Sequence, residues 1–184
     1  KKLYGMKKIG IITYFYYYNY GTMLQGYALH KALEKIGDSK YHVEIIDCRF
    51  GEKEFTKWEV LKIRIKRLLV YLREFERIRK QTYYKHEFLL RKPAFDDFAK
   101  SECCLSRNMY PTTLDLINNP PSYDIYFTGS DQTWSPKIGF RDSLFLTFAK
   151  PGAVRAAYAP SIGVTSFSDI ECTYVKERLQ HYHF

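Results

Sequence analysis

Short apolar runs end in polar, glycine-bearing loops at three places along this chain. The runs cover residues 8–14, 123–128 and 155–159, and Gly accompanied by Asn, Ser, Asp or Gln follows within a few residues of each. This pattern is typical of buried parallel strands that deliver polar groups to the carboxyl edge of an α/β sheet, where such folds bind ligands. We therefore expect three strands whose exits share one crevice.

A helical pattern separates the first strand from a further apolar run. Residues 22–36 carry apolar side chains at steps of three and four, and Gly37 is the expected stop. The run over 43–48 predicts a second strand. Strand, helix and strand in this order form a βαβ unit, which crosses over right-handed into a parallel sheet. The predicted fold class is α/β, with a Rossmann-like parallel sheet flanked by helices.

Helices are also predicted in the second half of the chain. A helical stretch over 83–100 is expected to be broken or restarted at Pro93, and a short helix over 111–118 to open on its proline. The final helix is expected to be capped by Asp169 and to be still running at Phe184. Because a helix that reaches the last residue lacks a cap, we expect the chain to continue beyond it.

The three loops supply the candidate site residues. Asp131 is the candidate catalytic residue, because a carboxylate at a strand exit can accept a proton from an attacking hydroxyl or orient it. The alternative is that Asp131 only caps its loop by accepting backbone N–H groups. The candidate substrate-binding residues are Asn19, Tyr20, Gly21, Gly129, Ser130, Gln132, Trp134 and Ser161.

Several of these residues have equally plain structural interpretations. Asn19 and Gly21 are turn residues that tolerate positive φ, and Trp134 is either a lid or a packing anchor. The helix that starts near Thr22 offers backbone N–H groups to a phosphate or carboxylate. The tyrosines of the first loop, at 16–18 and 20, either stack on a sugar ring or pack against the loop.

Other reactive residues lack a motif. Asp47 ends the second strand and could hold a ribose, but no Gly-x-Gly-x-x-Gly fingerprint accompanies it. The histidines are expected on helix surfaces or at the terminus. The four cysteines have no metal-ligand spacing, and the adjacent Cys103 and Cys104 make an awkward disulfide pair. We predict idle thiols in a reduced cytoplasmic setting, with no metal site and no cofactor.

Composition limits the classes of protein to which this chain can belong. The chain has 184 residues, of which 46% are hydrophobic and 17% aromatic, which suits one folded domain spanning residues 1–184. No run of 18 or more apolar residues is present, so a membrane-spanning helix is not predicted. A signal-like segment is likewise absent from the start of the sequence.

Positive charge is concentrated in one segment. The formal net charge is +9, and residues 57–92 are rich in Lys and Arg. Apolar residues recur there at helical steps, which predicts an amphipathic helix with a cationic face at about 58–80. Three interpretations stay open: a solvated helix packed on the domain, a helix that contacts an anionic membrane surface, and a nucleic-acid contact, which no recognised motif supports.

The loop sequences resemble a known family. Residues 19–29, 129–134 and 158–163 are similar in order and spacing to the N-terminal half of the polysaccharide pyruvyl transferases. Thr133, Ser135 and Pro160 depart from the family pattern. The resemblance covers roughly residues 7 to 165, and it implies the N-terminal half of a two-domain enzyme of GT-B-like architecture, followed by a second α/β half.

The resemblance also implies a reaction. A pyruvyl group passes from phosphoenolpyruvate, the donor substrate, to two hydroxyls of a saccharide acceptor, as a ketal, during synthesis of cell-surface polysaccharide. The acceptor is expected to be a saccharide, free or lipid-linked, and nucleic acid is not expected as a partner. No Arg or Lys stands inside the three loops, although Arg141 and Arg155 lie near them. Most donor-binding cations are thus expected in the second half, and this half alone is expected to be inactive.

Two other classes of function remain open. One is a glycosyltransferase of the same architecture, which would use a nucleotide sugar. The other is a non-catalytic binding domain that sits at the cytoplasmic face of the membrane through residues 57–92.

Overall fold

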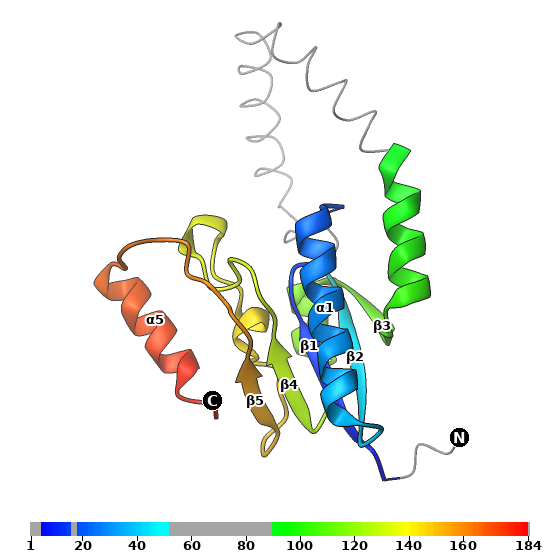
Figure 1. Cartoon of the computed structure of the whole chain (residues 1–184). Coiled ribbons are helices and arrows are strands. Elements are labelled where there is room, and N and C mark those ends of the chain that lie inside the picture. Colours follow the sequence, from blue (N-terminus) through cyan, green and yellow to red (C-terminus); the bar gives the residue numbers. More distant parts are fainter. Residues whose placement is uncertain (1–4, 16–17, 52–89, 184) are drawn as a thin grey trace, which may run out of the picture.

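A single sheet of parallel strands organises the protein. The computed structural model describes residues 5–15, 18–51 and 90–183. Five strands in these parts lie in the order β3-β2-β1-β4-β5 (Figure 1). They are β1 (Lys7–Ile12), β2 (Tyr41–Gly51), β3 (Leu105–Thr112), β4 (Ile125–Thr128) and β5 (Val154–Ala157). The predicted α/β class with a parallel sheet is confirmed.

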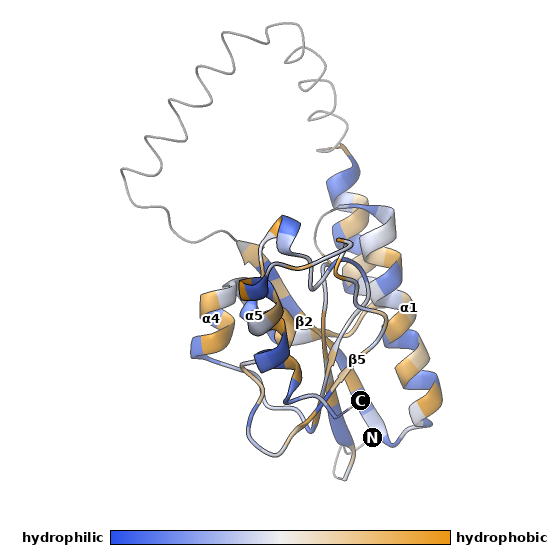
Figure 2. Ribbon diagram, turned by 90° about the vertical axis from the view of Figure 1, so that its left-hand side faces the viewer, coloured by the Kyte–Doolittle hydropathy of each residue, from blue (hydrophilic) through white to orange (hydrophobic). Residues whose placement is uncertain are grey.

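Helices cover both faces of the sheet. Figure 2 shows α1 (Tyr20–Gly37) on one side of the strands, with α4 (Thr113–Asn118) and α5 (Asp169–Leu179) on the other. Helical residues 90–102 pack on the same face as α1, since Phe95 and Ala99 join the core cluster that contains Met23 of α1. Two short 3₁₀ turns, η1 (Pro136–Ile138) and η2 (Asp142–Phe145), link β4 to β5.

The core consists of one apolar layer on each face of the sheet. The α1 layer contains Ile9, Ile11, Phe15, Met23, Val43 and Ile45, and the opposite layer contains Ile12, Ile46, Leu116, Tyr126, Leu144 and Leu146. Strands buried on both faces read as nearly continuous apolar runs. For this reason β1, β2 and β4 were predictable from the sequence, and the short run over 155–159 also located β5, although only Ala156 of this edge strand is buried.

Tyr126 supplies polar ties inside the second layer. Its side chain is fully buried, and its hydroxyl donates to the Pro121 carbonyl at 2.7 Å and accepts the Tyr123 N–H at 3.1 Å. Both backbone groups lie in the turn that leads into β4. A buried hydroxyl with two satisfied partners fixes where that strand begins.

β3 was missed by the sequence analysis. Only Ser106 and Tyr110 of this strand are buried, so the apolar pattern of a central strand is absent. Pro111 was expected to open a helix, but it lies near the end of β3, at the edge of the sheet. Thr112 is the residue that caps α4, through a reciprocal capping box with Asp115. A proline is tolerated in an edge strand because its missing N–H need not pair.

Two helix predictions are also corrected. Helical residues 90–102 run through Pro93 without a break. Ser168 rather than Asp169 caps α5, accepting from the Glu171 N–H while the Glu171 carboxylate accepts from the Ser168 N–H. α5 ends at Leu179 and does not run on to Phe184. The Ser-x-x-Glu capping box explains the start of this helix.

The chain after α5 returns to the sheet. The His183 N–H donates to the Arg155 carbonyl at 2.9 Å, and the Arg155 N–H donates to His183 Nδ1 at 3.1 Å. Arg155 lies in β5, the strand at the end of the sheet opposite β3. His183 therefore occupies the hydrogen-bonding groups of Arg155 on the outer edge of β5.

His30 and His42 do not lie on helix surfaces as expected. His30 is only 1% exposed, and its Nε2 donates to the Val43 carbonyl at 3.2 Å. Its Nδ1 is buried with no hydrogen-bond partner in the described parts of the chain. Burial is the largest cause of a lowered pKa for His30. His42 lies in β2.

Candidate functional site

The predicted strand exits do converge. The Gly129 N–H donates to the Ile12 carbonyl at 2.8 Å, and the Thr13 hydroxyl donates to the Ser130 carbonyl at 3.2 Å. Across the next strand pair, the Ser161 N–H donates to the Asp131 carbonyl at 2.8 Å. The loops after β1, β4 and β5 are thus hydrogen-bonded side by side at the carboxyl edge of the sheet, where α/β folds bind ligands.

Gly129 allows the closest approach between two of these loops. Its φ is not positive, so backbone conformation does not demand glycine here. A Cβ at this position would stand 2.7 Å from Thr13 Cβ and 2.9 Å from Thr13 Oγ1. Gly129 therefore serves close packing of the β1 and β4 exits, and its contact with a ligand stays a prediction.

Four of the seven described non-glycine residues with left-handed backbone conformations lie at the same edge. Tyr18, Phe50, Asp131 and Ala159 have φ values of 47°, 49°, 87° and 49°. Each follows or ends a strand. A residue with a side chain is uncommon at such angles and costs about 1–3 kcal/mol, so it persists only where its surroundings enforce it. Strain of this kind clusters at functional sites, and here it marks four strand ends.

A pocket of about 260 Å³ opens between these loops. We call this pocket the crevice. It is lined by Tyr14, Thr22, Asp131, Gln132, Ile138 and Arg141. They come from the β1 exit, the first turn of α1, the β4 exit and the η1–η2 region. The crevice combines a carboxylate, an amide, two hydroxyls and a guanidinium, which suits a polar, partly anionic ligand better than an apolar one.

Asp131 is half-buried and partly engaged by its own loop. Its Oδ1 accepts the Gln132 N–H at 2.7 Å, as a loop cap would. Among the described residues, no hydrogen bond reaches its other carboxylate oxygen. The carboxylate is therefore positioned by one oxygen and has the second available for a hydroxyl in the crevice.

Arg141 contributes a guanidinium to the lining of the crevice. Its guanidinium lies 5.6 Å from the Phe50 ring centre, and Nη1 donates to the Phe50 carbonyl at 3.4 Å. Its Nε is buried without a hydrogen-bond partner in the described parts of the chain. The guanidinium as a whole lines the crevice, and guanidinium groups bind carboxylates and phosphates through several N–H groups at once.

Gln25 holds the wall of the crevice in place. Its Nε2 donates to Thr13 Oγ1 at 2.9 Å, to the Tyr14 carbonyl at 3.1 Å and to the Thr22 carbonyl at 3.0 Å. These bonds link the β1 exit to the start of α1. Gln25 sits one turn into the helix, so the first turn of α1 and the strand before it keep a fixed relation.

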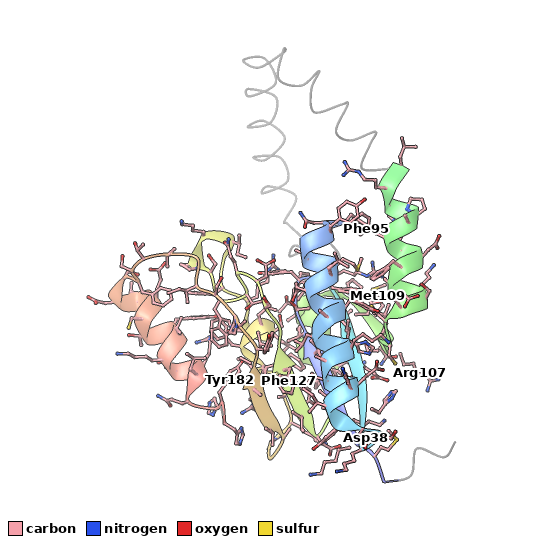
Figure 3. The ribbon with its side chains drawn as sticks, viewed as in Figure 1. Asp38, Phe95, Arg107, Met109, Phe127 and Tyr182 are labelled. Carbon is pink, nitrogen blue, oxygen red and sulfur yellow. The ribbon has the colours of Figure 1, made fainter. Side chains whose placement is uncertain are left out.

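Asn19 caps α1 instead of meeting the crevice. Its Oδ1 accepts the N–H groups of Gly21 at 2.8 Å and of Thr22 at 3.3 Å. Two of the donors that were expected to receive an anion are therefore already paired. Tyr20 is 63% exposed and contacts Phe95, with ring centres 4.9 Å apart, at a separate apolar pocket. Figure 3 shows Phe95 beside the first turn of α1.

Trp134 is a packing anchor, one of its two predicted roles. Its ring stacks on Phe145 with centres 5.5 Å apart, and its Nε1 donates to the Leu144 carbonyl at 3.0 Å. Its backbone N–H donates to the Ser161 carbonyl at 3.2 Å. Trp134 and Ser161 thus hold the β4 and β5 loops together behind Asp131. Ser130 contributes a carbonyl to Thr13, as described above.

Sequence reasoning placed Arg141 near the loops but gave it no role, and it assigned none to Tyr14. Neither stands in a glycine-bearing motif, and their places depend on contacts with distant residues. Asp47, a weak ribose candidate, is instead paired with Arg49 at 2.7 Å. Tyr16, Tyr17 and residues 57–89 lie outside the described residues, so the predictions for the aromatic loop and the basic helix fall largely outside them as well.

Comparison with protein-family models, with curated proteins and with solved structures finds no match to this chain. The part of the chain that the structure describes contains no helix long and apolar enough to cross a membrane.

Proposed function

We propose that the crevice is the saccharide-binding half of a pyruvyl-transferring enzyme. The observation that carries the proposal is that Asp131, Gln132 and Arg141 line one pocket at the carboxyl edge of a parallel sheet. The order and spacing of the three loop motifs support the same assignment. In this role the protein would act with phosphoenolpyruvate as donor and a saccharide as acceptor.

Asp131 suits the acceptor hydroxyl in this chemistry. Attack of a sugar hydroxyl on the donor requires a base that accepts its proton as the new C–O bond forms. One carboxylate oxygen of Asp131 is fixed by the Gln132 N–H, and no hydrogen bond from the described residues reaches the other. The Gln132 side chain, exposed at the rim of the crevice, can bind a neighbouring hydroxyl.

Arg141 suits an anionic group of one substrate. A carboxylate placed against the guanidinium of Arg141 in the crevice would gain a charge-assisted hydrogen bond, which is worth about 1.5–3 kcal/mol. The expectation that most donor-binding cations lie in a second half still stands as a prediction. Arg141 adds one cation to the crevice itself.

Calorimetry on the native protein separates this proposal from its main rival. We expect phosphoenolpyruvate to bind and Arg141→Gln to weaken its binding by about tenfold or more, since each 1.4 kcal/mol is a factor of ten. Arg107→Gln, an exposed arginine on β3, is the control for loss of charge. Tight binding of uridine diphosphate with none for phosphoenolpyruvate would instead favour a nucleotide-sugar glycosyltransferase.

Turnover tests the role of Asp131. Asn tolerates positive φ well, so Asp131→Asn keeps the strained backbone and the bond from the Gln132 N–H. We expect turnover by the native enzyme to fall by about 100-fold, the lower range for loss of a general base. Asp97→Asn, an exposed carboxylate on the helix over 90–102, should leave turnover unchanged. Unchanged turnover in Asp131→Asn would show that Asp131 only caps its loop and takes no part in the reaction.

A further inference from the structure

Three side chains of the types that bind metal ions lie close together at the end of the sheet opposite the crevice. His42 and Glu44 lie in the first half of β2, level with Lys8 and Gly10 of β1. Cys104 directly precedes β3, and its carbonyl accepts the Ile45 N–H at 2.8 Å. The crevice, by contrast, lies beyond Ile12, where β1 ends.

The three ligand atoms are close enough to share one ion. An imidazole nitrogen of His42, a carboxylate oxygen of Glu44 and the sulfur of Cys104 all lie within 4.8 Å of one another. All three residues are half-buried, and the His42 Nε2 to Glu44 Oε1 distance is 2.9 Å. In a tetrahedral zinc site the ligand atoms are about 3.5 Å apart, given bonds of about 2.0–2.3 Å. To reach that geometry the 2.9 Å separation of the His42 and Glu44 atoms must lengthen by about 0.6 Å, with the Cys104 side chain adjusting alongside them.

Glu44 is held in the manner of a metal ligand. The Tyr123 hydroxyl donates to Glu44 Oε2 at 2.6 Å, while Oε1 is the oxygen next to His42. Tyr123 is itself buried, so the bond fixes the carboxylate from the core side. Groups that orient a ligand in this way raise metal affinity and select the ligating atom.

We propose that His42, Glu44 and Cys104 form a binding site for a zinc-class divalent metal ion. Thiolate and imidazole ligands favour Zn²⁺ over Mg²⁺ or Ca²⁺, which prefer oxygen. Three protein ligands leave one tetrahedral position for water. Two ligands come from β2 and one from the residue before β3. The ion would therefore cross-link the two ends of the long connection between these neighbouring strands, and a cross-link that closes a long loop is expected to stabilise the fold most.

The thiol must lose its proton when the ion binds. Burial is the largest cause of a raised pKa for Cys104, and the carboxylates of Glu44 and Glu34 add to it while Lys31 opposes them. Without an ion the thiol therefore carries its proton. Binding forms the metal–sulfur bond and releases that proton to solvent. Sequence spacing gave no hint of this site, because its ligands come from two separate segments.

Cobalt substitution tests the site directly. We expect the metal-free chain to bind one Co²⁺ with the charge-transfer absorption of a cobalt–thiolate bond, and Zn²⁺ to displace it. Cys104→Ser should abolish that absorption, whereas Cys172→Ser, a half-buried thiol on α5, should preserve it. His42→Gln should lower the affinity for Zn²⁺ at least tenfold, and Tyr123→Phe by about 10–100-fold.

Thermal unfolding gives a second measurement that does not depend on the cobalt spectrum. Zn²⁺ should raise the Tm of the wild-type chain and of Cys172→Ser but not that of Cys104→Ser. The proposal is overturned if wild-type Co²⁺ absorption lacks the thiolate band. It is equally overturned if Cys104→Ser and His42→Gln bind Zn²⁺ as the wild type does, which would leave His42 and Glu44 as a simple ion pair.

Discussion

The contact between Gly129 and Thr13 offers the sharpest test of how the crevice is built. Gly129→Ala would place a methyl carbon 2.7 Å from Thr13 Cβ, whereas carbon atoms in contact prefer about 3.5–4.0 Å. The two strand exits must then separate by about an ångström. Over-packing of this kind typically costs about 1–3 kcal/mol. For a chain of this size, 2 kcal/mol corresponds to a fall in Tm of about 4–8 °C.

A double-mutant cycle isolates that clash from other effects of the substitution. Thr13→Gly removes both atoms nearest the new methyl group, although it also loses the hydrogen bonds of the Thr13 hydroxyl. Gly129→Ala should therefore cost about 2 kcal/mol in the wild-type background and little in the Thr13→Gly background. Urea denaturation of the four proteins supplies the free energies of unfolding.

The result that refutes the reasoning is an equal cost of Gly129→Ala in both backgrounds. The destabilisation would then come from elsewhere, and Gly129 would not be the point where β1 and β4 touch. Because the φ of Gly129 is not positive, backbone strain is already excluded as the cause.

Three further predictions concern stability. Tyr126→Phe should lower the free energy of unfolding by about 1–3 kcal/mol in urea, because it leaves the Pro121 carbonyl and the Tyr123 N–H unpaired; a loss below about 0.5 kcal/mol would contradict this. Ser168→Ala should cost about 1 kcal/mol by the same assay, through loss of the capping box of α5. The lowered pKa of His30 means that the unfolded chain binds a proton below about pH 6.5 while the folded chain resists it, so stability should fall as the pH drops through that range; His30→Gln should flatten this part of the pH profile.

The helices and strands that could be predicted from the sequence are those whose pattern of apolar residues reflects their own burial. β1 and β4 are short apolar runs, and the helical spacing before Gly37 indicated α1, although Leu24 and Ile36 of that helix are exposed. The run over 155–159 located β5 even though only Ala156 of this strand is buried. β3 could not, because an edge strand with exposed Arg107 and Met109 looks like a loop. The position of Pro111 reinforced that error, since proline also opens helices.

The residues of the candidate site likewise fall into those that the sequence could predict and those that it could not. Asp131 and Gln132 could be predicted because they follow a strand directly, and the carboxyl ends of parallel strands meet at one edge. Arg141 reaches the crevice only through the folding of the η1–η2 region, which no local pattern encodes. Asn19 and Trp134 were correctly singled out as special, but their contacts are with helix and core, so the signal came from structure rather than from a ligand.

The two outer strands have a consequence for self-association. An exposed strand edge is a template on which another chain can add and start an aggregate. On β5, His183 already occupies the N–H and carbonyl of Arg155, and on β3 Pro111 has no N–H to offer while the pairing with β2 is irregular. Both ends of the sheet are thus poor templates. Within the part of the chain that the structure describes, the sheet ends therefore give little support to fibre-like stacking, while the carboxyl edge, at right angles to those ends, stays open to a ligand.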